Sequence, residues 1–544
     1  MYSNQNALIM VTNPRLKILF LCLSFVLFQT AKAQIGNLVY SDSILHRIDV
    51  EIDIVNWIDT LNRDYSENLE NPELYPEVYR ECNVFFDGFA MSNCGIRTKG
   101  NTSNQWIDGN KKPFKLAFDA FVEQTFDGIK KVNLNNFNND PSLLKEATVF
   151  KLMRDAGLLA PRTAYAELYV NNEYWGVYLL IENIDKTFLR MKFGGGANND
   201  GNLYKTNLKG SSFPAFLKKY ENDNITIAQS GLKLTTNEDL NDWGGYLSFV
   251  DFLNTSTDEE FIQGFESRFD VHNYLKQLAI EKLVRANDTY WRGGNNFYLY
   301  EHPNGKMYWI PWDVNETFVS IKYLEWSGFI DGYLIQTNKL EDLPLVRRIL
   351  AVPKWKTEYL ETVCEISKSL YDVDLMGSKM VMWHTLVDEA YLNDPHKFND
   401  YEEFKKSLTE DYDDHLSIAN SPYRIKFTYP GLFPFIVSQR EWASDQMKGW
   451  DYHCDALNQN HQIQQLVVHP NPVNDKIYFQ SDLEGFNYCQ ISIYGLGGKE
   501  IYKSDFMFYT ESSFVDVSSF PQGFYIIRKT DADGKVSVGK FIKE

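Results

Sequence analysis

Two segments, NDTYWRGGNNFYLY (residues 287–300) and WIPWDVN (residues 309–315), each join an aromatic strand to acid or amide side chains. Strand ends can hold such side chains in a cleft, and carboxylate and amide oxygens suit Mg²⁺ or Mn²⁺. Phosphoryl transfer needs one carboxylate to receive a hydroxyl proton and another group to hold the metal on the phosphates. By spacing alone, an Asn-Asp pair before a strand is more often a turn than an active site.

Further motifs precede these two segments. They are GIRTKGNTS (95–103), KKPFKLAFD (111–119), KVNLNNFNNDPSLLKEATVFKLMRDAG (131–157), APRTAYAELYVNNEYWGVYLLIENIDKTFL (160–189) and GNLYK (201–205). Together with the first two segments, these motifs closely resemble the CotH (spore coat protein H) kinase family, and the resemblance covers roughly residues 41–355. The resemblance implies an atypical, protein-kinase-like fold and the transfer of phosphate from ATP to protein Ser or Thr with Mg²⁺ or Mn²⁺.

The resemblance also assigns roles to single residues. Asp288 would be the catalytic base, Asp313 would bind the metal, and Asn295 or Asn296 would offer an amide to it. Many family members carry a second acid two residues after the metal-binding Asp, where this chain has Asn315. An amide adds no charge, so a second metal would bind more weakly, and an inactive homologue is an alternative.

Several basic side chains are candidates for binding the phosphates, although each one alone is more commonly a solvated surface residue. They are Arg97, Lys99, Lys115 and Lys205. Lys115 paired with Glu146 would imitate the strand-lysine and helix-glutamate ion pair of kinases. Glu146 should face inward on a helix that starts at Asp140-Pro141 and stops at Gly157.

Aromatic residues near the two segments are expected to line the site, and one of them could stack on adenine. They are Tyr290, Trp291, Trp309 and Trp312. No GxGxxG motif opens a helix and no GxxxxGK[ST] motif occurs, which disfavours Rossmann and P-loop sites.

The pattern of hydrophobic residues predicts an α+β fold with two lobes. Strands are expected at 46–53, 84–89, 94–98 and 114–118, and a hairpin at 164–181, which gives a mixed β/α N-lobe. From about 258 to 450 the pattern is mainly helical, with an interruption at Pro353. We assign residues 34–457 to this domain, with the core at about 41–355 and a helical extension to about 457.

The C-terminal motifs indicate a separate domain. HPNPVNDKIYF (469–479), QISIYGLGGKEIY (490–502) and VDVSSFPQGFYIIRKTDADGKVSVGKFIKE (515–544) resemble the type A sorting domain of the type IX secretion system. That module is a small all-β sandwich on exported proteins of Bacteroidota. We assign it residues 466–544, after a polar linker at 458–465.

The N-terminus predicts export. Arg15 and Lys17 precede an apolar run at 18–28, and Ala31-Lys32-Ala33 fits a signal-peptide cleavage site, so residues 1–33 are the expected signal peptide. The run is too short to span a bilayer comfortably and no later stretch would do so. A secreted or surface-attached protein, exported through the periplasm by the type IX machinery, is therefore expected.

The composition limits the kinds of partner that this protein is expected to bind. A formal charge of −19 makes nucleic-acid binding unlikely, and 44% hydrophobic residues allow a large core. Of six cysteines, Cys22 leaves with the signal peptide, and Cys82 and Cys94 are placed to pair across a hairpin. An unidentified protein substrate is the expected partner of the kinase. The alternatives are a catalytically inactive scaffold or adhesion module and, from the abundant Trp and Tyr, a glycoside hydrolase.

Overall fold

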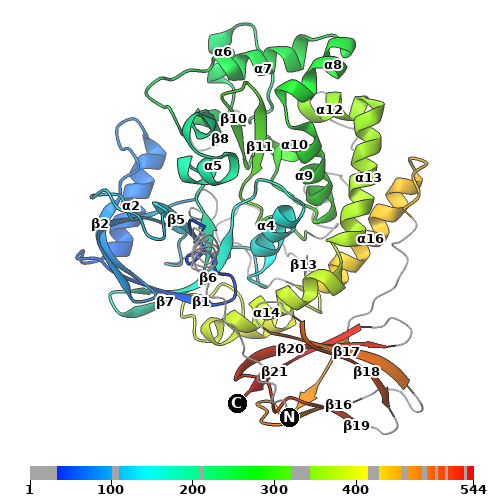
Figure 1. The fold of residues 1–544 in the computed structure, drawn as a ribbon. Coiled ribbons are helices and arrows are strands. Elements are labelled where there is room, and N and C mark those ends of the chain that lie inside the picture. Colours follow the sequence, from blue (N-terminus) through cyan, green and yellow to red (C-terminus); the bar gives the residue numbers. More distant parts are fainter. Residues whose placement is uncertain are drawn as a thin grey trace, which may run out of the picture.

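The computed structural model describes residues 34–100, 104, 109–207, 214–319, 343–413, 428–454, 464–480, 487–495, 500–508, 512–531 and 536–544. The expected signal peptide and most of the expected linker lie outside these ranges. Figure 1 shows a β-barrel, a mainly helical body built around a small sheet, and a terminal β-domain.

The N-terminal strands close into a barrel in the order β1-β2-β3-β4-β5-β7-β6. They are β1 (Leu45–Glu51), β2 (Arg80–Phe86), β3 (Phe89–Thr98), β4 (Phe114–Ala117), β5 (Lys131–Asn135), β6 (Thr163–Val170) and β7 (Glu173–Glu182). Closure comes from β1, which pairs antiparallel with β2 and parallel with β6. Alternate side chains such as Val84, Ile96 and Leu116 fill the interior, and α2 (Trp57–Glu70) adds apolar side chains to the same core. The α+β class is confirmed, while the closed barrel was not foreseen.

Helix α4 (Lys145–Asp155) starts later than the Asp140-Pro141 signal predicts. The Asp140 carboxylate accepts hydrogen bonds from the backbone N–H groups of Ser142, at 3.1 Å, and Lys145, at 2.9 Å. Between them Leu143 has a left-handed φ of 61°, which is incompatible with a helical turn. The expected inward orientation of Glu146 is confirmed, since only 5% of it is exposed.

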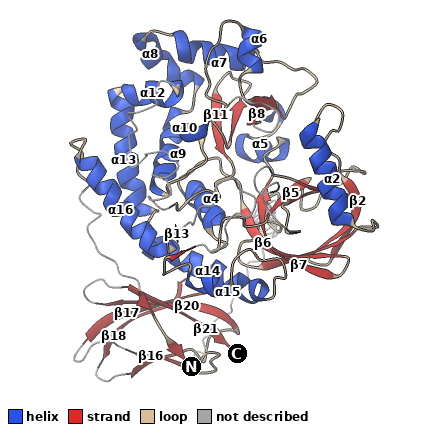
Figure 2. Ribbon diagram, turned by 180° about the vertical axis from the view of Figure 1, so that it is seen from behind, coloured by secondary structure: helices blue, strands red, loops and turns tan. Residues whose placement is uncertain are grey.

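A second sheet lies within the helical body, in the order β11-β10-β8-β9. Its strands are β8 (Asn202–Thr206), β9 (Leu232–Leu234), β10 (Phe297–Glu301) and β11 (Met307–Pro311). The surrounding helices are α5 (Lys186–Phe193), α6 (Asp223–Ala228), α7 (Gly244–Thr255), α8 (Asp258–Arg268), α9 (Val271–Leu283), α10 (Tyr290–Gly293), α12 (Pro344–Ala351), α13 (Pro353–Ser369), α14 (Val373–Leu392), α15 (Tyr401–Lys406) and α16 (Leu432–Lys448). Seen from behind, α9, α13 and α16 form one wall (Figure 2). The interruption at Pro353 is confirmed, because α13 starts there.

The terminal domain consists of two sheets, β14-β21-β20-β17-β18 and β15-β16-β19, around a shared core. Its strands are β14 (Gln464–Gln465), β15 (Val468–His469), β16 (Lys476–Gln480), β17 (Asn487–Gly495), β18 (Glu500–Phe508), β19 (Ser512–Asp516), β20 (Gly523–Asp531) and β21 (Val536–Lys543). Because β14 pairs with β21, this domain begins inside the stretch assigned to the linker. The domain packs against α14 (Figure 1).

A disulfide joins Cys364 of α13 to Cys454, whose Cα atoms are 5.7 Å apart. The expected Cys82–Cys94 pair is not bonded, although the two residues are direct partners across β2 and β3. Both thiols are buried, and burial raises the pKa of Cys94 to about 11, which disfavours the reactive thiolate.

Within the described ranges no helix combines the length and hydropathy needed to cross a bilayer.

Candidate functional site

Asp288 lies in the loop between α9 and α10, beside the chain that follows β11. Two backbone hydrogen bonds tie these stretches together. The N–H of Asn287 donates to the carbonyl of Glu316 at 2.7 Å, and the N–H of Phe318 donates to the carbonyl of Val284 at 2.7 Å. The loop that carries Asp288 is therefore anchored on both sides of that residue to the segment after Asp313.

The two candidate amides both hold Asp288. Asn296 Nδ2 donates to Asp288 Oδ2 and to its backbone carbonyl, each at 2.9 Å, and Asn295 Nδ2 donates to Oδ2 at 3.2 Å. Burial, with repulsion from Asp313 and Glu316, raises the pKa of Asp288 to about 6, against the opposing effect of the amides. Asp288 is therefore a fixed carboxylate that is mostly ionised at neutral pH.

Asp313 lies at the same end of the β10–β11 hairpin as Asn296. The register pairs Phe297 with Pro311, and the N–H of Trp312 donates to the carbonyl of Asn296 at 3.2 Å. Asp313 and Asn296 are both left-handed, with φ of 51° and 58°. Such conformations are unfavourable for residues with a side chain and tend to gather at functional sites.

Lys99 and Lys205 both lie close enough to Asp313 to be attracted by its charge. Lys99 directly follows β3 of the barrel and Lys205 belongs to β8; their ammonium groups lie 5.8 and 5.4 Å from the centre of the Trp312 indole. Burial lowers the pKa of Lys99 to about 8, against attraction from Asp313 and Glu146. Burial likewise lowers the pKa of Lys205, against attraction from Glu77 and Asp313.

Arg97 and Lys115 extend this group of cations along the barrel, as direct partners across β3 and β4. Arg97 forms an ion pair with Glu77 at 2.7 Å. Burial lowers the pKa of Lys115 well below its usual value, and repulsion from neighbouring cations adds to the effect. Within the described ranges, the ammonium groups of Lys99, Lys115 and Lys205 have no hydrogen-bonding or ion-pair partner.

The structure does not support the expected pairing of Lys115 with Glu146. Glu146 Oε2 accepts a hydrogen bond from Asn135 Nδ2 at 2.7 Å, and the lysine that influences it is Lys99. Burial, followed by repulsion from Asp313, raises the pKa of Glu146 to about 8, so this carboxyl is mostly neutral at pH 7. The reason is positional: Lys115 faces the other barrel cations, whereas Lys99 stands at the end of β3 near Asp313.

Comparison with known proteins shows the family of the chain. Residues 96–418, more than half of the chain, match the model of the CotH kinase protein family. The chain belongs to the CotH kinase family. The terminal β-domain, residues 467–544, matches the secretion system C-terminal sorting domain, so this CotH family protein is exported and is either secreted or held at the cell surface.

The relatives share low sequence identity with this chain, but the matched regions are long. Inner spore coat protein H of Bacillus subtilis (strain 168) is 25% identical over 332 residues, which cover 57% of this chain and 84% of that protein. Invasin CotH2 of Rhizopus delemar is 26% identical over 255 residues, or 45% of this chain and 41% of the invasin. A spore coat protein H-like protein of Bacillus subtilis is 20% identical over 282 residues, 52% of this chain and 76% of that protein.

Glu316 is a site residue that the sequence analysis missed. Its Oε1 accepts a hydrogen bond from Asn139 Nδ2 at 3.0 Å, and its charge helps to raise the pKa of Asp288, after burial and Asp313. The family pattern draws attention to position 315, where this CotH protein has Asn. Glu316 stands one position later, and this acid could have been recognised in the sequence as a candidate site residue.

The aromatic candidates separate into core and site residues. Trp309 stacks on Phe297 at 4.0 Å, and Tyr290 contacts both rings edge-on, so Trp309 and Tyr290 are core. The ammonium of Lys282 lies 3.4 Å from the centre of the Trp291 ring. Trp312 is the candidate that faces the site lysines.

The described ranges contain no group of three or more His, Cys, Asp or Glu side chains that could hold a metal ion. The candidate donors are Asp313, which lies near Lys99 and Lys205, and the side-chain carbonyl oxygens of Asn295 or Asn296, whose amide nitrogens bind Asp288. This set fits Mg²⁺, which keeps several waters and is commonly bound by one or two carboxylates together with substrate phosphates.

Proposed function

We propose that this protein is an exported, metal-dependent kinase that transfers the γ-phosphate of ATP to Ser or Thr hydroxyls of a protein. The observation that carries the proposal is a group of buried lysines, Lys99, Lys115 and Lys205, which have no ion-pair partner among the described residues, and Asp313 lies near Lys99 and Lys205. A desolvated ammonium without a counter-ion is unfavourable, and a polyphosphate supplies the missing negative charge. The barrel and the helical body, which flank this group, would be the two lobes of a protein-kinase-like fold.

Asp288 is the general base in this proposal. Its two amide donors fix the carboxylate, which would accept the proton of the attacking hydroxyl. With a pKa of about 6, it is in the required ionised form at neutral pH and loses this role as the pH falls through 6. The acid limb of kcat/KM is therefore expected near pH 6.

Asp313 is the principal metal ligand in this proposal, with a carbonyl oxygen from Asn295 or Asn296. A divalent ion at this position supplies positive charge that neutralises the phosphate oxygens and holds them in place. Because so few protein donors are present, metal and nucleotide should bind together, and Mg²⁺ alone should bind weakly. Lys99 and Lys205, which both lie near Asp313, would bind the phosphates.

The direct test is incubation of residues 34–544 with γ-labelled ATP and Mg²⁺ or Mn²⁺, followed by detection of label on the protein itself or on a generic protein substrate. Transfer should be lost in Asp313→Ala and Asp288→Ala. It should persist in Asp200→Ala, which removes an exposed carboxylate outside the site. Retention of full activity by either site variant would contradict the proposed roles.

A non-catalytic surface adhesion module is the second candidate. It is favoured by the relative named an invasin and by Asn315 in place of a second acid. This candidate predicts that the protein transfers no phosphate even when metal and nucleotide bind. The labelling experiment, run beside a nucleotide-binding measurement, separates the two candidates.

A further inference from the structure

Helix α14 presents one face to the sorting domain. Asp374, Val381, Thr385 and Asp388 follow one another at intervals of seven, four and three residues, which places all four on the same side of the helix. The opposite side, which includes Trp383, is buried in the main hydrophobic core. This helix therefore has a second face, acidic at both ends, that the CotH domain does not use for its own core.

The sorting domain meets this face with a matching sheet surface. Ile526 and Arg528 alternate along β20, and the register pairs them with Lys540 and Val538 of β21, so all four side chains share one side of the sheet. Arg528 forms an ion pair with Asp374 at 3.3 Å. At the other end of the helix face the Lys540 ammonium lies 3.6 Å from the Asp388 carboxylate.

Asp388 is held in position for this contact by its own domain. The Tyr401 hydroxyl donates to its Oδ1 at 2.7 Å, and Lys405 lies 3.4 Å from its Oδ2. Asp388 therefore does not have to be ordered by the sorting domain when Lys540 approaches, which reduces the entropic cost of the contact.

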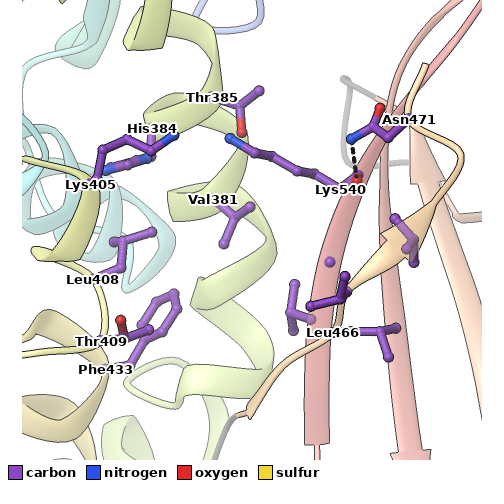
Figure 3. A pocket seen from close by; sticks show the side chains of 14 residues that line it. Val381, His384, Thr385, Lys405, Leu408, Thr409, Phe433, Leu466, Asn471 and Lys540 are labelled. Atoms are coloured by element: carbon purple, nitrogen blue, oxygen red, sulfur yellow. Dashed lines mark hydrogen bonds between the residues drawn. The ribbon is translucent and has the colours of Figure 1, made fainter. Parts of the chain in front are cut away.

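Beside Lys540 the packing between the two domains is incomplete. A cavity of about 290 Å³ separates the domains, with Val381, Thr385 and Lys405 on the helical side (Figure 3). Leu466, Val538 and Lys540 belong to the opposite wall. The Thr385 hydroxyl oxygen is buried without a hydrogen-bonding partner among the described residues. Side chains that line this cavity lack dispersion contacts on that side, although Val538 of its wall also packs against the main core. Apolar contact persists at Ile526, which joins the main core.

We propose that this face of α14 is a dedicated docking surface for the chain's own sorting domain, and that the two ion pairs hold the domains together reversibly. The sorting domain is the occupant because its cations match the helix acids at both ends. Salt weakens both ion pairs only in part, because partly buried pairs at 3.3 and 3.6 Å are screened less than exposed charges, whereas reversing the charges makes both contacts repulsive. None of the residues that line the cavity belongs to the candidate phosphate site, so docking and catalysis are separate.

Charge reversal tests the proposal in residues 34–544. Small-angle scattering of the parent in low salt should give a radius of gyration near the roughly 24 Å of a compact chain of this length. Asp374→Arg with Asp388→Lys should raise it by several ångströms, because both contacts with the sorting domain then become repulsive. Adding Arg528→Asp and Lys540→Asp should restore the compact value, since both pairs are then re-formed with reversed sign.

Glu259→Lys with Glu365→Lys is the matched control, because it makes the same charge change at exposed positions on α8 and α13. Circular dichroism should show equal helix content in all variants. The proposal is overturned if the double reversal stays compact, if the quadruple variant stays extended, or if compaction depends on protein concentration. The last result would mean that a second copy provides the sorting domain. Phosphate transfer is not a readout, so the outcome is independent of the proposed kinase activity.

Discussion

The titration of Lys99 should make nucleotide affinity depend on pH in a specific way. Burial lowers the pKa of Lys99 to about 8, and a bound polyphosphate would raise it again by attraction. Binding therefore takes up a proton above pH 8, and affinity present below pH 8 is lost as the pH rises. For one such proton the loss at pH 9 relative to pH 7 is about tenfold, or about 1.4 kcal/mol. Glu146, with a pKa of about 8, ionises in the same range and adds repulsion.

Calorimetric titration with ATP at pH 7.5, 8.25 and 9 measures this effect, because the phosphates are already largely ionised throughout. The logarithm of Kd should approach a slope of between one and two per pH unit above pH 8. Lys99→Arg keeps its charge and should retain only the Glu146 part of the slope; Glu146→Gln should retain only the Lys99 part. A parent affinity that is constant between pH 7.5 and 9, or an unchanged slope in Lys99→Arg, would refute the reasoning.

Three other outcomes are expected. In thermal denaturation with Mg²⁺ and ATP at 100 times Kd, the parent should gain about 2.7 kcal/mol. Asp313→Ala should lose most of this gain, whereas Asp288→Ala should keep it. Equal gains in stability in both variants would contradict the roles assigned to Asp313 and Asp288. Lys111→Met should lower the free energy of unfolding in urea by about 3–5 kcal/mol, because it leaves Asp394, 0% exposed in its side chain, without its cation. Deletion of residues 466–544 should leave a folded protein retained in the periplasm, and normal surface delivery would contradict this.

Local patterns in the sequence were sufficient for many elements. The hairpin of β6 and β7 lies where the sequence predicts one, and α8 to α16 lie in the stretch of about 258–450 that is predicted to be mainly helical. The inward position of Glu146 follows from helical spacing and does not need the exact helix start. The expected helix start at Asp140-Pro141 was wrong. The Asp140 carboxylate accepts a hydrogen bond from the backbone N–H of Lys145, and the left-handed Leu143 between them prevents the helix from beginning at Pro141.

Contacts between distant segments could not be predicted. Barrel closure depends on β1 pairing with β6, more than a hundred residues later. The buried Lys111–Asp394 ion pair joins residues 283 positions apart, and no local pattern links them. The choice between Lys99 and Lys115 depends on how the barrel faces Asp313. The disulfide illustrates the same limit, since Cys364 bonds with Cys454 across 90 residues while the neighbouring Cys82 and Cys94 stay reduced.

The departure at Asn315 has a different meaning once Glu316 is placed. Asn315 removes one negative charge from the expected motif, but the carboxylate of Glu316 is held by Asn139 close enough to Asp288 to help raise its pKa. The backbone explains this position, since the Glu316 carbonyl accepts the N–H of Asn287 and brings the residue beside the loop of the proposed base. The site therefore keeps a second acid on the side of Asp288, where its charge acts on the proposed base. Loss of a metal ligand at position 315 and loss of catalysis are then separate questions, because the proposed metal ligand Asp313 and the proposed base Asp288 are both retained.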